Sequence, residues 1–337
     1  MKKSIRRLLL GVLILLTLLV CAGYYMLGYA LQPKDLAERS RDIEGSLKMV
    51  TERYPHLSGW IDSLTTANAL HQVSLTGVAG ENLQGYYVAA AQPTDRTAVI
   101  VHGYTDNALR MLMIGYLYSH ELGYNILLPD LHAHGLSEGQ AIRMGWLDRL
   151  DVMQWMDYAD ELFGRPFGST RMVVHGISMG AATVMMLAGE EANLMPYARC
   201  FVEDCGYTSV WDEFRSELKG QFGLPAFPLL HLTSLLCQME YGWNFREASA
   251  LKQVARCQLP MLFIHGENDT FVPTAMVHTL YQAKPEPKAL WIAPGSAHAM
   301  AYHDHPQAYT AQVNAFVERY IPQESATACD KTGALND

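Results

Sequence analysis

Beyond its first seven residues, the 337-residue sequence has no cluster of basic residues. The chain holds 25 Lys and Arg, four of them within Lys2–Arg7, so the remainder carries 21 against 34 Asp and Glu, a net charge of −13. An acidic surface does not attract phosphate backbones or anionic head groups over a broad area. Because the chain also has no RNA-binding motif, we expect no nucleic-acid partner.

The cysteines show no close pairing pattern. Cys200 and Cys257 precede strands that we expect to be neighbours, and Cys205 is within reach of Cys237, so an exported domain could form disulfides there. Free buried thiols are the alternative, and connectivity cannot be deduced from spacing. The six cysteines occupy positions 21, 200, 205, 237, 257 and 329.

Spacings typical of metal sites are also missing. The sequence has two His-x-His pairs, His132 with His134 and His303 with His305, and both fall in segments expected to be loops. We interpret them as polar loop residues rather than metal ligands, because no Cys or His spacing matches a zinc site. The sequence therefore predicts no metal and no organic cofactor.

Charged residues are absent from Leu8 to Leu31, a Leu-rich run of 24 residues. At about 1.5 Å per residue, such a helix spans a hydrocarbon layer of roughly 30 Å with some tilt. The basic residues before it favour a cytoplasmic N-terminus. We therefore predict that residues 1–32 are a transmembrane signal-anchor that contacts the bilayer through residues 8–31 and leaves the rest of the chain on the extracytoplasmic side.

A cleaved secretory signal is the alternative interpretation of the same segment. Gly28-Tyr29-Ala30 offers the small residues that signal peptidase requires. The apolar run is longer than the roughly 7 to 15 residues of an ordinary signal, which favours the uncleaved anchor. Cleavage would give a secreted protein, so both interpretations place the remainder of the chain outside the cytoplasm.

Residues 33–70 combine mixed charge with helical spacing and are predicted to form a membrane-proximal helical stalk. Two strands around 73–77 and 86–91 then suggest a hairpin at a sheet edge. Helices and strands alternate afterwards, and parallel strands need such helical crossovers. The sequence therefore predicts an α/β domain over residues 71–322, a mostly parallel sheet flanked by helices, and a flexible C-terminal tail over 323–337.

The segment Gly176-Ile177-Ser178-Met179-Gly180 joins an apolar strand at 171–177 to a helix at 179–191. A G-x-S-x-G sequence between strand and helix is typical of a nucleophile elbow, where the glycines permit a strained turn and the serine hydroxyl is exposed above the sheet. We therefore predict that Ser178 is a catalytic nucleophile.

A serine nucleophile needs a histidine base that is oriented by an acid, in the chain order Ser, Asp, His. Asp269 follows the short apolar strand beginning at Pro260, and His298 follows the strand Ala289–Ile292. Both therefore lie at the carboxyl ends of strands, where ligands bind in such sheets. Asp269 and His298 are the predicted acid and base; the alternatives are Glu267 and Asp304 for the acid, and His303 and His305 for the base.

These segments, with His102-Gly103-Tyr104 after the strand 98–102, resemble the α/β-hydrolase superfamily, in particular bacterial serine aminopeptidases (S33), monoacylglycerol lipases and cinnamoyl esterases. The resemblance implies an oxyanion hole made by the backbone N–H groups of Tyr104 and Met179. Residues 130–139, DLHAHGLSEG, are similar to the D-x-R-G-H-G-x-S-x-G loop of that family, but with His132 in place of arginine and Ala133 in place of glycine.

About 50 residues separate the expected strand at 201–206 from the next one. A single crossover helix does not need that length, so residues 208–258 are predicted to form a small helical cap inserted after strand 6. The cap is apolar and aromatic, as expected for an acyl- or aryl-binding wall, although the same residues could simply pack the cap helices. Candidate pocket residues are His102, Trp211, Phe214, Phe222 and Phe227.

The sequence therefore predicts a serine hydrolase that cleaves small or medium acyl or aryl esters through a Ser-His-Asp triad and an acyl-enzyme. An exported peptidase acting on short peptides is the alternative, with Glu203 or Asp204 receiving the substrate amine. A membrane-tethered binding module without activity is an alternative of another class. The fold cannot choose among these functions, and the sequence does not indicate an oligomeric state.

Overall fold

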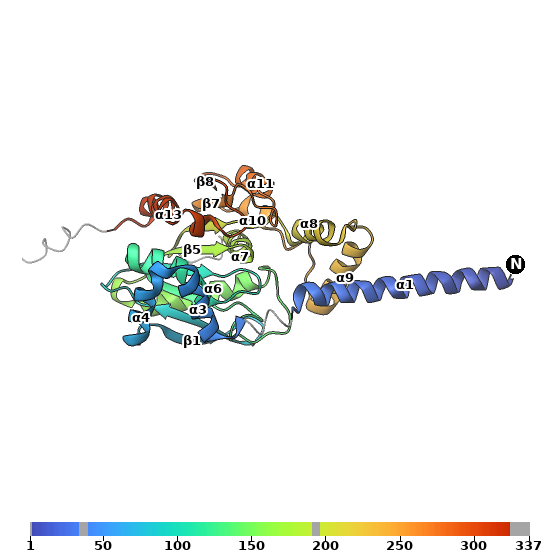
Figure 1. Cartoon of the computed structure of the whole chain (residues 1–337), viewed down its shortest axis with the longest axis horizontal. Coiled ribbons are helices and arrows are strands. Elements are labelled where there is room, and N and C mark those ends of the chain that lie inside the picture. Colours follow the sequence, from blue (N-terminus) through green and yellow to red (C-terminus); the bar gives the residue numbers. More distant parts are fainter. Residues whose placement is uncertain (1, 34–39, 191–195, 324–337) are drawn as a thin grey trace, which may run out of the picture.

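Eight strands form one sheet in the computed structural model, which describes residues 2–33, 40–190 and 196–323 (Figure 1). Their order is β1-β2-β4-β3-β5-β6-β7-β8. Strand β2 is antiparallel to both of its neighbours, and the other pairs are parallel. The strands are β1 His71–Thr76, β2 Asn82–Val88, β3 Arg96–Val101, β4 Asn125–Pro129, β5 Arg171–Ile177, β6 Ala198–Asp204, β7 Met261–Gly266 and β8 Lys288–Ala293. The predicted α/β fold is confirmed, with the expected hairpin, β1-β2, at one sheet edge.

Helices cover both faces of the sheet. Alternate strand residues face opposite sides, so Val99 and Val101 belong to one buried cluster while Ala98 and Ile100 belong to another. The first cluster includes residues of α6, α7, α10 and the cap; the second includes residues of α3, α4, α5 and α13. The helices are α1 Lys2–Leu31, α3 Ile43–Arg53, α4 Ser58–Thr66, α5 Leu112–Tyr116, α6 Asp148–Gly164, α7 Met179–Ala188, α8 Val210–Phe222, α9 Leu229–Tyr241, α10 Ala250–Val254, α11 Ala275–Ala283, α12 Ala301–Asp304 and α13 Pro306–Tyr320.

The segment expected to be a stalk packs against the sheet instead. Val50 on α3, Tyr54 after it and Ile61 on α4 are buried in the same cluster as Ile100 of β3. Apolar residues at helical spacing form a stripe that needs a packing partner, and here the partner is the domain. Residues 40–70 therefore belong to the folded body in the structure, and the expectation of a stalk was wrong.

Helix α1 projects from the body, and its C-terminal end packs on the cap (Figure 1). Side chains from residue 3 to residue 18 are exposed, whereas Leu27 and Leu31 are buried in the main core. Among the described residues, α1 is the one helix that is long enough and apolar enough to cross a membrane. Signal sequences share this property. The domain boundaries drawn from the sequence stay predictions, and the expected tail lies outside the described residues from 324 onward.

The cap connects β6 to β7, as predicted, and consists mainly of α8 and α9. The cysteines that could have joined the cap to the sheet are buried thiols that form no disulfide with one another: Cys200, Cys205, Cys237 and Cys257. Cys21 on α1 is also free, and Cys329 lies outside the described residues.

Candidate active site

Ser178 occupies a strained turn between β5 and α7. Its backbone has φ 57° and ψ −118°, a left-handed conformation that non-glycine residues rarely adopt. Two close contacts explain the flanking glycines. A Cβ atom on Gly176 would lie 2.2 Å from the carbonyl oxygen of Gly180, and a Cβ on Gly180 would lie 2.1 Å from that of Val101. Only glycine fits at either position, so the G-x-S-x-G sequence is required by packing.

The structure brings the three candidate triad residues together. Oγ of Ser178 lies 2.8 Å from Nε2 of His298, and Nδ1 of His298 donates to Oδ2 of Asp269 at 2.7 Å. The other carboxylate oxygen of Asp269 accepts from the backbone N–H groups of Phe271 and Val272, both at 3.0 Å. Asp269 is therefore fixed in position, the imidazole is held in one tautomer, and Nε2 is free to take the serine proton.

The alternatives for the acid and the base have other partners. Glu267 accepts from the backbone N–H of Gly295 at 2.8 Å. His303 is paired with Asp304 at 3.0 Å, and Nε2 of His305 contacts the carbonyl oxygen of Pro294 at 2.8 Å. None of these contacts involves Ser178, so the geometry favours Asp269 and His298.

A second imidazole helps to keep Asp269 charged. Burial alone would raise the pKa of Asp269, but hydrogen bonds from His265 and His298 outweigh burial and hold that pKa below its usual range. Nε2 of the fully buried His265 lies 3.3 Å from Oδ2 of Asp269 and donates to the carbonyl oxygen of Val272 at 2.9 Å. An ionised Asp269 can stabilise the imidazolium that forms on His298 during proton transfer.

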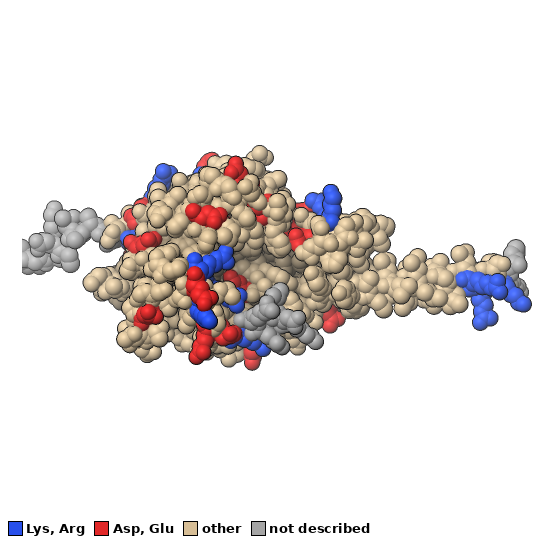
Figure 2. All heavy atoms as spheres, viewed as in Figure 1, with Lys and Arg blue, Asp and Glu red and all other residues tan. Residues whose placement is uncertain are grey.

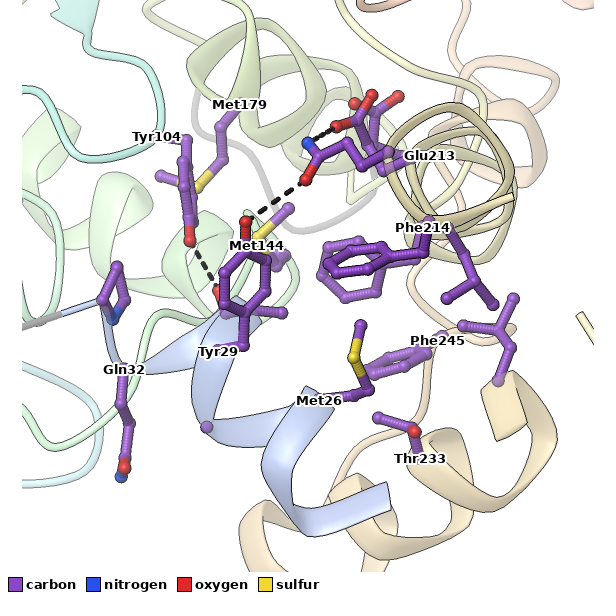
Figure 3. A pocket seen from close by; sticks show the side chains of 18 of the residues that line it. Met26, Tyr29, Gln32, Tyr104, Met144, Met179, Glu213, Phe214, Thr233 and Phe245 are labelled. Atoms are coloured by element: carbon purple, nitrogen blue, oxygen red, sulfur yellow. Dashed lines mark hydrogen bonds between the residues drawn. The ribbon is translucent and has the colours of Figure 1, made fainter. Parts of the chain in front are cut away.

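The turn His102-Gly103-Tyr104 lies directly against the nucleophile. A Cβ atom on Gly103 would be 3.5 Å from Cβ of Ser178. Tyr104 and Met179 line the same cavity as Ser178 (Figure 3). This arrangement suits an oxyanion hole built from their two N–H groups, and Met179 is also the first residue of α7, where a helix dipole favours negative charge.

Two buried histidines connect this turn to the neighbouring loop. His102 donates from Nδ1 to the carbonyl oxygen of Gly103, and its Nε2 accepts from the N–H of Leu131 at 2.9 Å. In return, Nε2 of His134 accepts from the N–H of Thr105 at 3.1 Å. Burial lowers the pKa of both rings, to about 4 for His134. Both therefore stay neutral, as these acceptor roles require. His102 is fully buried and does not line the pocket, contrary to the prediction.

The loop that departs from the family sequence keeps a compact shape. Ala133, at the usual glycine position, takes a left-handed φ of 62°. Nε2 of His132 lies 3.0 Å from a carboxylate oxygen of Glu81, which also accepts from Arg143 at 2.5 Å. Arg143 also pairs with Asp151 at 3.1 Å, so this charged group links the loop to α6.

A cavity of about 980 Å³ extends from Ser178 between α1, α8 and α9 (Figure 3). Its size is at the upper end of the range for small-molecule sites, which are mostly apolar. Phe214 and Phe222 line it, as predicted. Trp211 and Phe227 do not: Trp211 is buried under the guanidinium of Arg246, and Phe227 is exposed on the outer surface of the cap.

Sequence analysis missed several residues that line this cavity. Met26 and Tyr29 come from α1, which was interpreted only as a membrane segment. Glu213 and Glu217, four residues apart on α8, add two carboxylates to an otherwise apolar wall. The helical spacing of Glu213 with Phe214, Glu217 and Leu218 indicated an amphipathic helix, but spacing alone does not show which face meets a cavity.

Burial raises the pKa of Glu213 well above its usual range, and repulsion from Glu217 and Asp269 adds to this effect. Its Oε2 has no hydrogen-bond partner among the described residues. Burial therefore favours the protonated form of Glu213, which can donate to a polar group of a bound molecule. The candidates Glu203 and Asp204, by contrast, are buried at the carboxyl end of β6 and line neither cavity. Glu203 accepts from the N–H of Gly206.

A second hollow of about 320 Å³ lies on the other side of Ser178, beneath α3. Arg53, Asp106 and Arg110 line it together with His298. Ser178 and Tyr104 belong to both cavities. The reacting centre therefore lies between a large apolar space and a smaller polar one.

One group of possible metal ligands occurs among the described residues, and it overlaps the triad. Donor atoms of Cys205, Asp269 and His298 lie within 4.8 Å of one another. Burial raises the pKa of the Cys205 thiol well above its usual range, so this sulfur is protonated and a poor ligand. Asp269 and His298 already bond to each other, and the geometry fits a triad better than a metal site.

Comparisons with known proteins agree with this fold and chemistry. Residues 140–324 match the model of the prolyl oligopeptidase family. The Bacillus subtilis protein YqkD is 31% identical over 239 residues, which cover 71% of this chain and 76% of YqkD. The Escherichia coli K12 protein YfhR is 25% identical over 250 residues, which cover 73% of this chain and 79% of YfhR.

Among solved structures, the Pyrococcus furiosus esterase Pf2001 superimposes with a TM-score of 0.60 at 22% identity, over 74% of this chain and 92% of the esterase. The acylaminoacyl peptidase of Pyrococcus horikoshii gives a TM-score of 0.54 at 17% identity, over 76% of this chain but only 42% of the peptidase. At these identities the likeness shows the α/β-hydrolase fold. With the family match, it leads to one conclusion: this chain belongs to the prolyl oligopeptidase family and is a serine hydrolase.

Proposed function

We propose that this protein is a membrane-anchored esterase that hydrolyses carboxylic esters through Ser178, His298 and Asp269. The observation that carries the proposal is the large apolar cavity that opens directly from Oγ of Ser178. Such a cavity suits an acyl or aryl group better than a peptide, whose amide groups need hydrogen-bond partners. The narrower likeness to serine aminopeptidases, monoacylglycerol lipases and cinnamoyl esterases stays a prediction.

The reaction follows from the geometry. Nε2 of His298 takes the proton of Ser178 as Oγ attacks the ester carbonyl, and the N–H groups of Tyr104 and Met179 stabilise the oxyanion. His298 then gives this proton to the departing alkoxide, which leaves as the alcohol, and the acyl group remains on Ser178. Water, deprotonated by His298, attacks the acyl-enzyme and releases the carboxylic acid. The acyl group occupies the large cavity, and the alcohol occupies the hollow beneath α3.

The direct test is labelling of the full-length protein in detergent with a fluorophosphonate, followed by hydrolysis of p-nitrophenyl esters. We expect labelling that Ser178→Ala abolishes, together with a loss of turnover of several orders of magnitude. Labelling that persists in Ser178→Ala would remove Ser178 as the nucleophile. A folded protein that neither reacts nor turns over any ester would favour the binding-module alternative.

A peptidase acting on short peptides is the second candidate, and Glu213 is the observation that favours it. The buried carboxyl group of Glu213, whose Oε2 has no hydrogen-bond partner among the described residues, could pair with a substrate amine and gain its negative charge as the amine binds. Aminoacyl-nitroanilides test this function beside the esters. If Glu213→Gln raises KM for the anilides and not for simple esters, the peptidase assignment is supported; no hydrolysis of anilides by the parent protein would eliminate it.

We further propose that α1 is an uncleaved anchor, with the catalytic domain outside the cytoplasm. Its length and hydropathy support this location, and Arg6 and Arg7 precede the apolar run. Protease added to spheroplasts should digest the domain. Complete protection of the domain in sealed cells, with digestion only after lysis, would place it in the cytoplasm.

A further inference from the structure

One face of α1 packs against the cap. Residues Gly23, Leu27 and Leu31 are buried at intervals of four, the spacing of a single helix face. At Gly23 the approach is close, because a Cβ atom there would lie 2.9 Å from Cδ1 of Leu236 and 3.3 Å from Cγ of Leu232, both on α9. Helix α9 therefore lies alongside α1 at the level of residue 23.

This contact sets the depth of the cap relative to a membrane. Counted from Leu8, about 20 helical residues fill the hydrocarbon layer, which ends near Leu27. Tyr24, Tyr25 and Tyr29 then lie around its outer boundary, where aromatic residues concentrate. Gly23 is four residues before Leu27, about 6 Å inside the boundary. The part of α9 that packs on Gly23 must lie at the same depth.

Several large apolar side chains are exposed on the cap, beside polar ones such as Glu240. Side chains that a soluble protein would bury are exposed there, among them Leu235 and Met239 of α9, which are 55% and 71% exposed. Phe227, in the turn before α9, is 72% exposed. In Figure 2, no charged residue is visible on α1 between its basic N-terminal end and the cap. Exposed apolar groups of this extent mark interaction surfaces.

The same end of α1 forms a wall of the acyl cavity. Met26, Tyr29 and Ala30 line it (Figure 3), and the hydroxyl of Tyr104 donates to the carbonyl oxygen of Ala30 at 2.8 Å. The hydroxyl of Tyr29 donates to Gln221 of α8 at 3.2 Å, and thus joins α1 to the cap. The cavity therefore lies between the anchor and the cap, at the level of the outer boundary of the bilayer.

We propose that the cap, through Phe227, Leu235 and Met239, sits in the outer leaflet beside α1, and that the substrate is a long-chain acyl ester of a membrane amphiphile that enters the cavity from this leaflet. The inference rests on the proposed esterase function and on α1 acting as an anchor. It makes α1 a substrate-binding element as well as a tether.

The test uses the full-length protein in phosphatidylcholine vesicles and two substrates, p-nitrophenyl palmitate in the bilayer and p-nitrophenyl acetate in water. The variant Leu235→Glu/Met239→Glu places two carboxylates on the apolar face without touching a cavity residue. The matched control is Phe167→Glu, an apolar position that is 46% exposed and lies between α6 and β5, at the opposite ends of the strands. The readout is the ratio of the palmitate rate to the acetate rate.

We expect this ratio to fall about tenfold or more in the double variant, because carboxylates are excluded from the acyl region, and to stay unchanged in Phe167→Glu. Equal ratios in the double variant and the parent would overturn the inference while leaving the esterase function intact. If the parent protein neither reacts with the fluorophosphonate nor hydrolyses p-nitrophenyl acetate, the proposed function and the inference are both refuted. If labelling shows that the double variant is misfolded, the same ratio measured on Leu235→Gln and Met239→Gln decides.

Discussion

Leu31→Ala tests whether the end of α1 is part of the folded domain. The side chain of Leu31 is 1% exposed and packs in the main core. Its carbonyl oxygen accepts from the N–H of Ile142 at 2.8 Å, a bond that alanine preserves. The substitution therefore removes side-chain packing alone. Cleavage after Ala30 would separate Leu31 from α1 and make it the first residue of the mature protein, and the change would then have little effect on stability.

The expected loss follows from the burial. Replacing a fully buried leucine by alanine lowers the free energy of unfolding by about 2 to 5 kcal/mol. For a domain of this size about 1 kcal/mol corresponds to a Tm shift of roughly 2 to 4 °C, so a loss near 3 kcal/mol lowers Tm by about 6 to 12 °C. The matched control is Leu18→Ala, at a position on the same helix that is 62% exposed, where the change stays within about 0.5 kcal/mol.

Thermal unfolding of the three full-length proteins in one detergent, followed by tryptophan fluorescence, measures the difference. KM for p-nitrophenyl decanoate, measured on the same samples, should rise in Leu31→Ala because the adjacent residues of α1 line the cavity. Identical Tm values for Leu31→Ala and Leu18→Ala would show that α1 does not contribute to the core, and would remove the structural basis for α1 as a cavity wall.

Three further predictions concern the site. Asp269→Asn should lower kcat by about 10⁴-fold with little change in KM, because the imidazole loses its charged acceptor and its productive tautomer. Steady-state kinetics at several pH values measure this loss, and a loss below tenfold would contradict the assigned role. Ala133→Gly should raise stability by about 1 kcal/mol, since Ala133 has φ 62° and glycine adopts this conformation without strain; a urea midpoint that does not increase would show that the loop stores no strain. Burial lowers the pKa of His134 to about 4 from an ordinary 6.5, so its contribution to stability is complete above pH 6.5 and is lost as pH falls towards 4. Tm should therefore fall less steeply over this pH range in His134→Gln than in the parent. Parallel curves of Tm against pH for the two proteins would refute the assignment.

The elbow could be predicted because its sequence is dictated by contacts that tolerate one residue type. A Cβ atom on Gly176 or Gly180 would lie 2.2 or 2.1 Å from a backbone oxygen, so the local geometry dictates glycine at both positions. Asp269 and His298 follow from chain order and from strand ends that meet at one edge. These features need only local sequence and the rule for parallel sheets.

The packing of α1 could not be predicted, because its buried residues and its exposed residues are both apolar. In an amphipathic helix the period of apolar residues identifies the buried side. Here Gly23, Leu27 and Leu31 are buried while Leu16 and Leu18 are exposed, yet all lie in one continuous apolar run. The same limitation applies to the cap, where Trp211 and Phe214 lie on one helix and only Phe214 meets the cavity.

His102 shows a different limitation. Its place in the turn His102-Gly103-Tyr104 predicted a pocket residue, but the sequence does not show which way a side chain points in a turn. Its side chain turns inwards, towards the N–H of Leu131. The stalk expectation failed because the pattern of residues 40–70 specifies an amphipathic helix without specifying which surface covers its apolar side.

The position of Ser178 between two unequal cavities has a consequence for the products. If the substrate is the proposed ester of a membrane amphiphile, the acid released from the large cavity is apolar and returns to the leaflet, whereas the alcohol released from the hollow lined by Arg53, Asp106 and Arg110 passes into water. Under the proposed function, this separation lowers the joint concentration of acid and alcohol at the serine and so slows resynthesis of the ester.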